Sequence, residues 1–122
     1  MTEAIVSCAP ADTVHTAATL MAVHRINAVV VMQNAEATGV ISQTDVVLAR
    51  QGRSREEAQS LPVSEVMSDG CVTCDVDALL SDAVTTMSRL KIHRLVVTRT
   101  EGSRAVPVGL LSMTDVVRKL ML

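Results

Sequence analysis

The chain has 122 residues, of which 48% are apolar, 20% are charged and none is aromatic, and its formal net charge is −2. This length suits one modest core or two small interlocked cores. The interspersed charges exclude the basic stripe of a general nucleic-acid binder, and no apolar run approaches the ~20 residues of a membrane span. Because the amino terminus lacks a secretory signal, we expect a cytoplasmic protein.

The first half of the chain indicates the element order β-α-β-β-α. The run AIVSC predicts a short strand, and Thr13 is a good N-cap for the helix that follows. Further strands are predicted at NAVVVM (27–32) and GVIS (39–42), before a second helix that begins at TDVV. The apolar stripe of the first helix comprises Val14, Ala17, Ala18 and Met21.

The second half repeats this pattern. Residues 1–32 align with 67–98 without a gap and with nine identities, and GVISQTDVV (39–47) aligns with GLLSMTDVV (109–117) with six identities in nine. A four-residue insertion near EGSRAVPV separates the two alignments. Leu79, which replaces Thr13, is a poor N-cap. The stripe of the matching helix comprises Leu80, Ala83, Val84, Met87 and Leu90.

The predicted fold class is α+β, with two β-α-β-β-α repeats packed about a pseudo-twofold axis, because two copies are too few for a solenoid. We place the first repeat at 1–50, a linker at 51–62 and the second repeat at 63–122. The segment RQGRSREEAQSLP (50–62) is polar and charged, which is typical of a helix tail followed by a surface linker.

A four-residue motif recurs where a strand ends and a helix begins. Its shared residues are Ser42, Thr44 and Asp45 in the first copy and Ser112, Thr114 and Asp115 in the second, with a variable residue after the serine. Backbone N–H groups at a helix start favour an anion. The hydroxyl groups can donate to phosphate oxygens, and the aspartate can accept from both hydroxyls of a ribose, so the motif suits a sugar phosphate.

A structural alternative explains part of the motif. Ser-x-x-Asp at a helix start is close to a capping box, which stabilises a helix by about 1 kcal/mol without any ligand. Capping makes no demand on Thr44 or Thr114. Because both copies keep this threonine, a preceding glycine (Gly39, Gly109) and the following DVV, we favour ligand contact by at least one copy.

His93 and Arg94 precede a core strand in the second copy, where the first copy has Asn27 and Ala28. An Arg guanidinium suits phosphate recognition, although such a pair can also be merely solvated. We therefore expect two unequal sites, of which the second is the better anion site.

The cysteines leave a metal or redox role open. Cys71 and Cys74 have CxxC spacing, and Cys8 is a third cysteine. A zinc site needs further ligands, and GCVTCDV instead indicates a strand whose residues three apart point to opposite faces. We therefore favour small structural cysteines and predict no metal site.

The duplicated pattern resembles a tandem pair of cystathionine β-synthase (CBS) domains, the Bateman module. The resemblance rests on VSEVMSDGCVTCDVDALLSDAVTTMSRLKIHRLVVT followed by GLLSMTDVV, and KIHRLVV is similar to a segment of the nucleotide-sensing subunit of AMP-activated kinases. It implies two ligand clefts between the repeats, with AMP, ADP, ATP or S-adenosylmethionine as occupants and no required cofactor. In similar modules the motif contacts the nucleotide and the HR pair contacts phosphates.

Two departures from the family pattern affect the adenine pocket. Val29 and Leu95 stand where the family usually has proline in the first core strand. Without aromatic residues, adenine has to rest on aliphatic groups. We name Val6, Val40, Val72 and Leu110 for this role, with Ile5 and Cys71 nearby.

No catalytic set is evident, so we do not expect an enzyme. The leading hypothesis is a regulatory module that senses adenine nucleotides or adenosyl ligands. The alternative is a structural or dimerisation module, with empty clefts, that braces a partner or an effector domain absent from this chain. Both hypotheses predict self-association, as a homodimer of modules.

Overall fold

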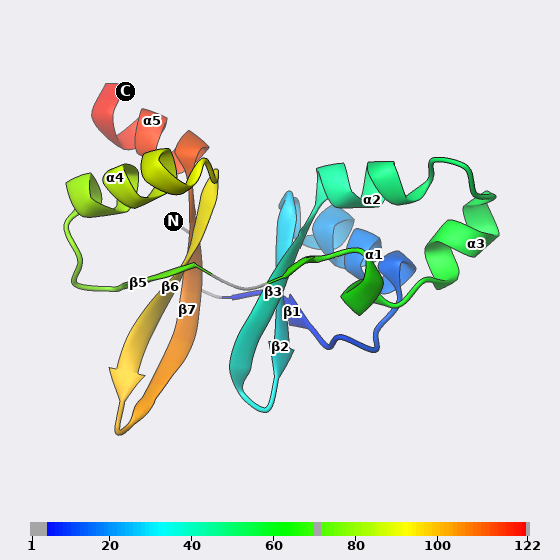
Figure 1. Cartoon of the computed structure of the whole chain (residues 1–122), viewed down its shortest axis with the longest axis horizontal. Coiled ribbons are helices and arrows are strands. Elements are labelled where there is room, and N and C mark those ends of the chain that lie inside the picture. Colours follow the sequence, from blue (N-terminus) through cyan, green and yellow to red (C-terminus); the bar gives the residue numbers. More distant parts are fainter. Residues whose placement is uncertain (1–4, 70–71, 122) are drawn as a thin grey trace. The chain divides into compact units, whose positions relative to one another are not determined.

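The computed structural model describes residues 5–69 and 72–121, which form two compact units (Figure 1). One unit spans Val6–Cys71, and the other spans Val72–Leu122 and includes Ile5. Each unit contains the predicted β-α-β-β-α order, so the prediction of an α+β fold made of two repeats is confirmed.

The first unit is built around a four-stranded sheet in the order β1-β2-β3-β4. β1 runs parallel to β2, while β2–β3 and β3–β4 are antiparallel. Its elements are β1 (Ser7–Cys8), α1 (Val14–His24), β2 (Ala28–Gln33), β3 (Glu36–Ser42), α2 (Gln43–Ala49), α3 (Arg55–Ser60), the 3-10 turn η1 (Val63–Glu65) and β4 (Ser68–Asp69).

The second unit has a three-stranded sheet in the order β5-β6-β7, in which β5 is parallel to β6 and β6 is antiparallel to β7. The four-residue insertion lengthens the hairpin: β6 and β7 have eight and nine residues, whereas β2 and β3 have six and seven. The elements are β5 (Thr73–Asp75), α4 (Leu80–Leu90), β6 (Arg94–Glu101), β7 (Arg104–Ser112) and α5 (Met113–Met121).

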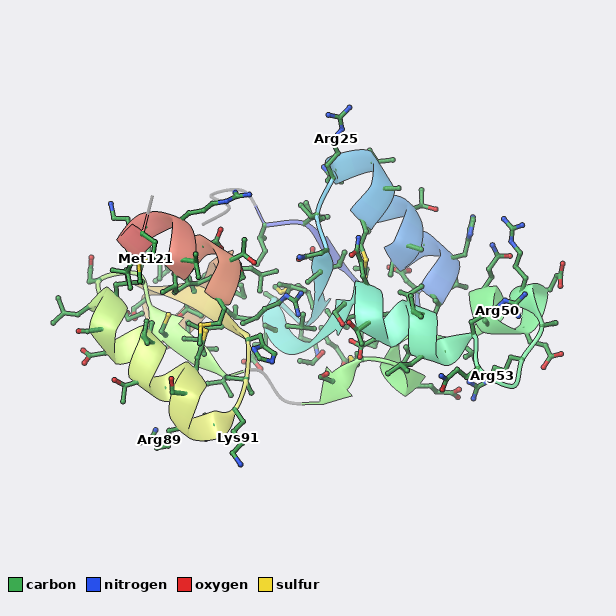
Figure 2. The ribbon with its side chains drawn as sticks, turned by 90° about the horizontal axis from the view of Figure 1, so that it is seen from above. Arg25, Arg50, Arg53, Arg89, Lys91 and Met121 are labelled. Atoms are coloured by element: carbon green, nitrogen blue, oxygen red, sulfur yellow. The ribbon has the colours of Figure 1, made fainter. Side chains whose placement is uncertain are left out.

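The helix ends follow local chemistry. The Thr13 hydroxyl accepts a hydrogen bond from the Thr16 amide, whereas Leu79 provides no side-chain cap, as predicted for both. Arg25 and Lys91 end α1 and α4 in the left-handed conformation, with φ of 54° and 55°. Both side chains are exposed and labelled in Figure 2. Both repeats therefore end their first helix with a basic residue in a conformation that usually takes glycine.

Each unit has its own aliphatic core between the helices and one face of the sheet. Alternate strand residues face the helices, as strand geometry requires. The buried cluster of the first unit comprises Cys8, Val14, Ala17, Met21, Val29, Val31, Ile41 and Val63. That of the second comprises Ala83, Met87, Leu95 and Val116. In the predicted stripes, Ala18, Leu80 and Val84 are half-buried and Leu90 is exposed.

The segment expected to be a surface linker is folded against the first unit. Ala58 of α3 is buried, and the Leu61 carbonyl accepts a 2.9 Å hydrogen bond from the Val14 amide. Val63, which the sequence assigned to the second repeat, is fully buried in the core of the first unit. The few apolar residues of this mostly charged segment thus pack it against the first unit, because their burial is favourable while its charged side chains stay in solvent. Arg50 and Arg53 lie at the α2–α3 connection (Figure 2).

Candidate functional site

The two copies of the Ser-x-Thr-Asp motif lie at equivalent strand-to-helix junctions. Ser42 ends β3 and is followed by α2, and Ser112 ends β7 and is followed by α5. α5 has nine residues and α2 has seven, so the helix after the second copy is the longer one. The predicted placement of the motif at the start of a helix is therefore confirmed.

Serine and aspartate form the same capping box in both copies. In the first, Asp45 Oδ2 accepts from the Ser42 amide at 2.8 Å and from the Ser42 hydroxyl at 3.0 Å, while the Asp45 amide donates to Ser42 Oγ at 3.2 Å. The corresponding distances between Ser112 and Asp115 are 2.9, 3.0 and 3.2 Å. The serine and the aspartate of each copy therefore cap the helix, as the structural alternative predicted.

Capping does not account for the threonines. Thr44 and Thr114 are exposed, and neither hydroxyl takes part in a hydrogen bond among the residues that the structure describes. Each lies one residue after the first residue of its helix, where the helix start favours negative charge. Both hydroxyls remain available to a ligand.

The second motif copy lies beside the HR pair. Arg94 is directly opposite Ser112 in the β6–β7 ladder, and the His93 carbonyl accepts a 2.9 Å hydrogen bond from the Met113 amide. Residues directly opposite each other in a ladder share a face of the sheet. The structure therefore brings Arg94 and the motif together, although 18 positions separate Arg94 from Ser112 in the chain.

The first copy keeps the backbone arrangement without the cation. Ala28 is opposite Ser42, and the Asn27 carbonyl accepts a 3.0 Å hydrogen bond from the Gln43 amide. Ala28 is buried and carries neither charge nor hydrogen-bonding group on its side chain. The predicted inequality of the two copies thus has a structural basis in one pair of equivalent positions, Ala28 and Arg94.

The Arg94 side chain contains an unsatisfied donor. Its Nε is buried and has no hydrogen-bond partner among the described residues, while His93 beside it is exposed. A buried donor without a partner costs ~1–3 kcal/mol, and more when the group is charged. An anionic oxygen near the start of α5 would satisfy this donor and would also interact favourably with the helix dipole.

The pKa of the Asp115 carboxyl lies below its ordinary value. Burial acts to raise it, and the hydrogen bonds from the Ser112 amide and hydroxyl are among the effects that lower it. Near neutral pH the carboxyl is therefore an ionised acceptor, as recognition of ribose hydroxyls requires.

The four predicted aliphatic contacts are all half-buried, and Leu110 and Val40 have surroundings that differ from those of Val72. Leu110 lies two residues before Ser112 and therefore on the same face of β7, and Val40 has the same relation to Ser42. Val72 instead packs against the core cluster of the second unit. The Val6 and Val72 carbonyls accept hydrogen bonds from Val30 and Val96 at 3.2 and 3.0 Å.

A further polar residue near the first motif copy was not predicted. Ser68 of β4 is exposed and is opposite Val40, and it therefore lies on the face of β3 that carries Ser42. A two-residue strand gives no periodic signal in a sequence. The alignment of MSD (67–69) with MTE (1–3) was the one available sign that this lead-in belongs to a repeated element.

Gly39, which precedes the first copy of the ligand motif, has a packing role. A Cβ at this position would lie 2.7 Å from the Ser68 carbonyl oxygen and 2.7 Å from Met67 Sδ. Glycine therefore allows β4 to approach β3. Close packing of β4 therefore explains why residue 39 is glycine, without any ligand.

The cysteine environments favour structural roles. Burial, followed by the nearby Asp12 carboxylate, raises the pKa of the buried Cys8 thiol to about 11. Burial and then Asp75 also raise the pKa of Cys74, whereas Cys71 lies outside the described residues. Within the described ranges, no group of three or more His, Cys, Asp or Glu side chains could hold a metal ion. Nor does any helix in this part of the chain have the length and apolarity to cross a membrane.

Comparison with known proteins is consistent with these geometries. The model of the CBS domain family matches residues 1–52 and 63–122, which is nearly the whole chain. This chain belongs to the CBS domain family. CBS domain proteins are regulatory modules, and the two matches correspond to the two repeats.

Similar proteins cover the tandem CBS pair to different extents. The CBS domain-containing protein YhcV of Bacillus subtilis is 32% identical over 95 residues, which make up 78% of this chain and 66% of that protein, slightly less than two thirds of its length. The crystal structure of ATU1752 from Agrobacterium tumefaciens, a CBS-domain containing protein, is 24% identical, with a TM-score of 0.80 over 96% of this chain and 90% of that one. MJ1225 from Methanocaldococcus jannaschii, for which homology to γ-AMPK has been proposed, is 21% identical, with a TM-score of 0.80 over 98% of this chain and 47% of that one.

Proposed function

We propose that this CBS pair is a regulatory module that binds an adenosine-containing ligand: AMP, ADP, ATP or S-adenosylmethionine. The observation that carries the proposal is the Arg94 side chain, which lies opposite Ser112 at the start of α5 with its buried Nε unsatisfied. An anionic group on the ligand would satisfy this donor. That the ligand occupies clefts between the repeats stays a prediction of the family resemblance.

Each residue of the second motif copy has a role in this proposal. Arg94 and His93 hold the anionic group, the Thr114 hydroxyl donates to it, and Asp115 accepts from the ribose hydroxyls. Asp115 can do so without leaving the capping box, because a carboxylate oxygen can accept more than one hydrogen bond. Leu110 lies on the same face and supplies an aliphatic contact for adenine. The first copy offers equivalent ribose contacts through Asp45 but has Ala28 in place of the cation.

Regulation requires that the ligand bind two arrangements of the module with different affinity. A partner or effector domain would then respond to whichever arrangement the ligand favours. We propose that the chain acts in this way, without catalysing a reaction.

Isothermal titration of the purified chain with AMP, ADP, ATP and S-adenosylmethionine tests the proposal. We expect binding heat from at least one of them, and no heat from any up to millimolar concentration would refute it. Absorbance gives a second test, because a chain without Trp, Tyr and Phe has almost no band of its own in the near ultraviolet. A purine band in the purified protein would reveal a co-purified nucleotide.

Asp115→Ala, with Asp45→Ala as its matched control, separates ligand contact from capping. Both variants remove the same capping box, so each should lose about 1 kcal/mol of folding stability. Asp115→Ala should in addition abolish binding of the anionic ligand at the copy that contains Arg94. Wild-type affinity of Asp115→Ala for the anionic ligand would show that the capping box, and not the ligand, explains this aspartate.

A second candidate function is structural: self-association that braces a partner or an effector domain. It is favoured by exposed apolar residues on α2 and α5, notably Val47 and Val117 at equivalent positions of the two repeats, which are 68% and 53% exposed. Such residues are buried when two modules associate. Sedimentation should then show a homodimer in the absence of ligand, and Val47→Glu or Val117→Glu should weaken it. A monomer at high protein concentration would exclude this candidate.

A further inference from the structure

The β6–β7 hairpin continues beyond the strand that covers its outer side. β5 pairs with β6 as far as Asp75 opposite Thr98, whereas the β6–β7 ladder continues to Glu101 opposite Arg104 (Figure 1). Arg99, Thr100 and Glu101 are all exposed. The insertion in the second repeat therefore leaves a short stretch of β6 with one uncovered edge.

The backbone of Thr100 is directed to this edge. The Val96 amide donates to the Val72 carbonyl at 3.0 Å, and the Val76 amide donates to the Thr98 carbonyl at 2.7 Å, so Val96 and Thr98 direct backbone groups toward β5. Alternate residues of a strand direct these groups to the same edge. The N–H and C=O of Thr100 consequently point to the same side, where none of the described residues pairs with them.

The opposite edge of this ribbon, along β7, is interrupted by a proline. Pro107 of β7 is opposite Thr98 and has no N–H to donate to an added strand. The corresponding stretch of β6 contains no proline, so pairing at β6 meets no such interruption.

We propose that this edge of β6 pairs with the same edge of a second copy of the chain, antiparallel and centred on Thr100. The two Thr100 residues then exchange both backbone hydrogen bonds. The twofold symmetry also places Arg99 of each copy opposite Glu101 of the other, so two oppositely charged pairs form at once. This contact is separate from the exposed apolar residues of α2 and α5 and from the ligand site.

The charge pattern also selects the register. Charged side chains on an edge strand usually prevent pairing with another strand. Here, a shift that centres the pairing on Arg99 would place like charges opposite each other, whereas the register centred on Thr100 pairs unlike charges. A second copy of this chain therefore fits the edge better than a strand of unrelated sequence.

Disulfide trapping tests the pairing directly. Thr100→Cys is made in the full chain together with Cys8→Ala, Cys71→Ala and Cys74→Ala. Ser103→Cys, which is also exposed and lies in the adjacent turn, serves as the control. The proposed register brings the two introduced thiols to a Cα separation of about 5.5 Å, which a disulfide can span. The Thr100→Cys chain should give disulfide-linked dimer faster than the control under mild oxidation. An equal rate would overturn the proposal.

Charge reversal tests the register. In the Thr100→Cys chain, Arg99→Glu alone or Glu101→Arg alone makes both pairs repulsive and should slow trapping by about tenfold. An equimolar mixture of the two single reversals should recover the rate, because each supplies the charge that the other needs. A chain with both reversals should recover it as well. Trapping that is insensitive to either reversal would contradict the register.

Discussion

Replacing Gly39 by alanine tests how tightly the inter-repeat segment is held against the first sheet. A Cβ at residue 39 would lie 2.7 Å from the Ser68 carbonyl oxygen and 2.7 Å from Met67 Sδ. The Met67 side chain can move, but the Ser68 carbonyl belongs to backbone that pairs with β3. Overpacking of this kind costs ~1–3 kcal/mol, so we expect Gly39→Ala to destabilise the chain by about 2 kcal/mol.

Whether Gly39→Ala lowers or raises the free energy of unfolding shows whether residue 39 is in close contact with β4 or in open space. In open space, glycine to alanine would stabilise the protein by ~0.4–1 kcal/mol, because the unfolded chain loses freedom. Urea unfolding followed by far-ultraviolet circular dichroism measures the difference. The double variant Gly39→Ala/Met67→Ala should recover part of the loss, since one of the two contacts is removed. A neutral or stabilising Gly39→Ala would refute the close approach.

Three further predictions concern stability. Ala35 has φ of 65° in the two-residue turn between β2 and β3, where glycine is preferred, so Ala35→Gly should raise the free energy of unfolding by about 1 kcal/mol in urea denaturation. Lys91→Gly should stabilise by ~0.5–1 kcal/mol in the same assay, because Lys91 ends α4 in the left-handed conformation; a loss would contradict the assigned C-cap. Because folding raises the pKa of Cys8 from 9.0 to about 11, its contribution to stability is complete below pH 9 and is lost as the pH rises through 11. Unfolding at several pH values should show this decline, and Cys8→Ala should remove it.

The local features of the fold could be predicted because nearby residues determine them. Thr13 and Leu79 differ in capping ability, and the apolar stripes follow helix periodicity, so both helix starts and most of the buried helix residues were expected. The β-branched runs likewise identified the core strands. Duplication strengthened these predictions, because each element was seen twice.

Long-range pairing explains most of what the sequence did not show. β4 has two residues and is specified by contact with Gly39, some 30 positions earlier, and no local pattern encodes that contact. Ala58 and Val63 lie in or beside a charged stretch, where composition indicated a linker. The placement of Arg94 opposite Ser112 depends on the hairpin register, which includes an irregularity after Val97. The residue types at the site could therefore be predicted, but their pairing required the structure.

The most direct test of the ligand proposal is to titrate wild type and Arg94→Gln with AMP or ATP and, separately, with adenosine, which has no phosphate. Arg99→Gln serves as the control variant. Arg99 is an exposed arginine on the same strand, so its loss should leave the affinity unchanged. Arg94→Gln should weaken binding of AMP or ATP by ~10–100-fold, because charge-assisted hydrogen bonds to the phosphate are lost, and should leave adenosine binding unchanged. Equal affinity of wild type and Arg94→Gln for the phosphate-bearing ligand would contradict the assignment of this arginine as the anion contact.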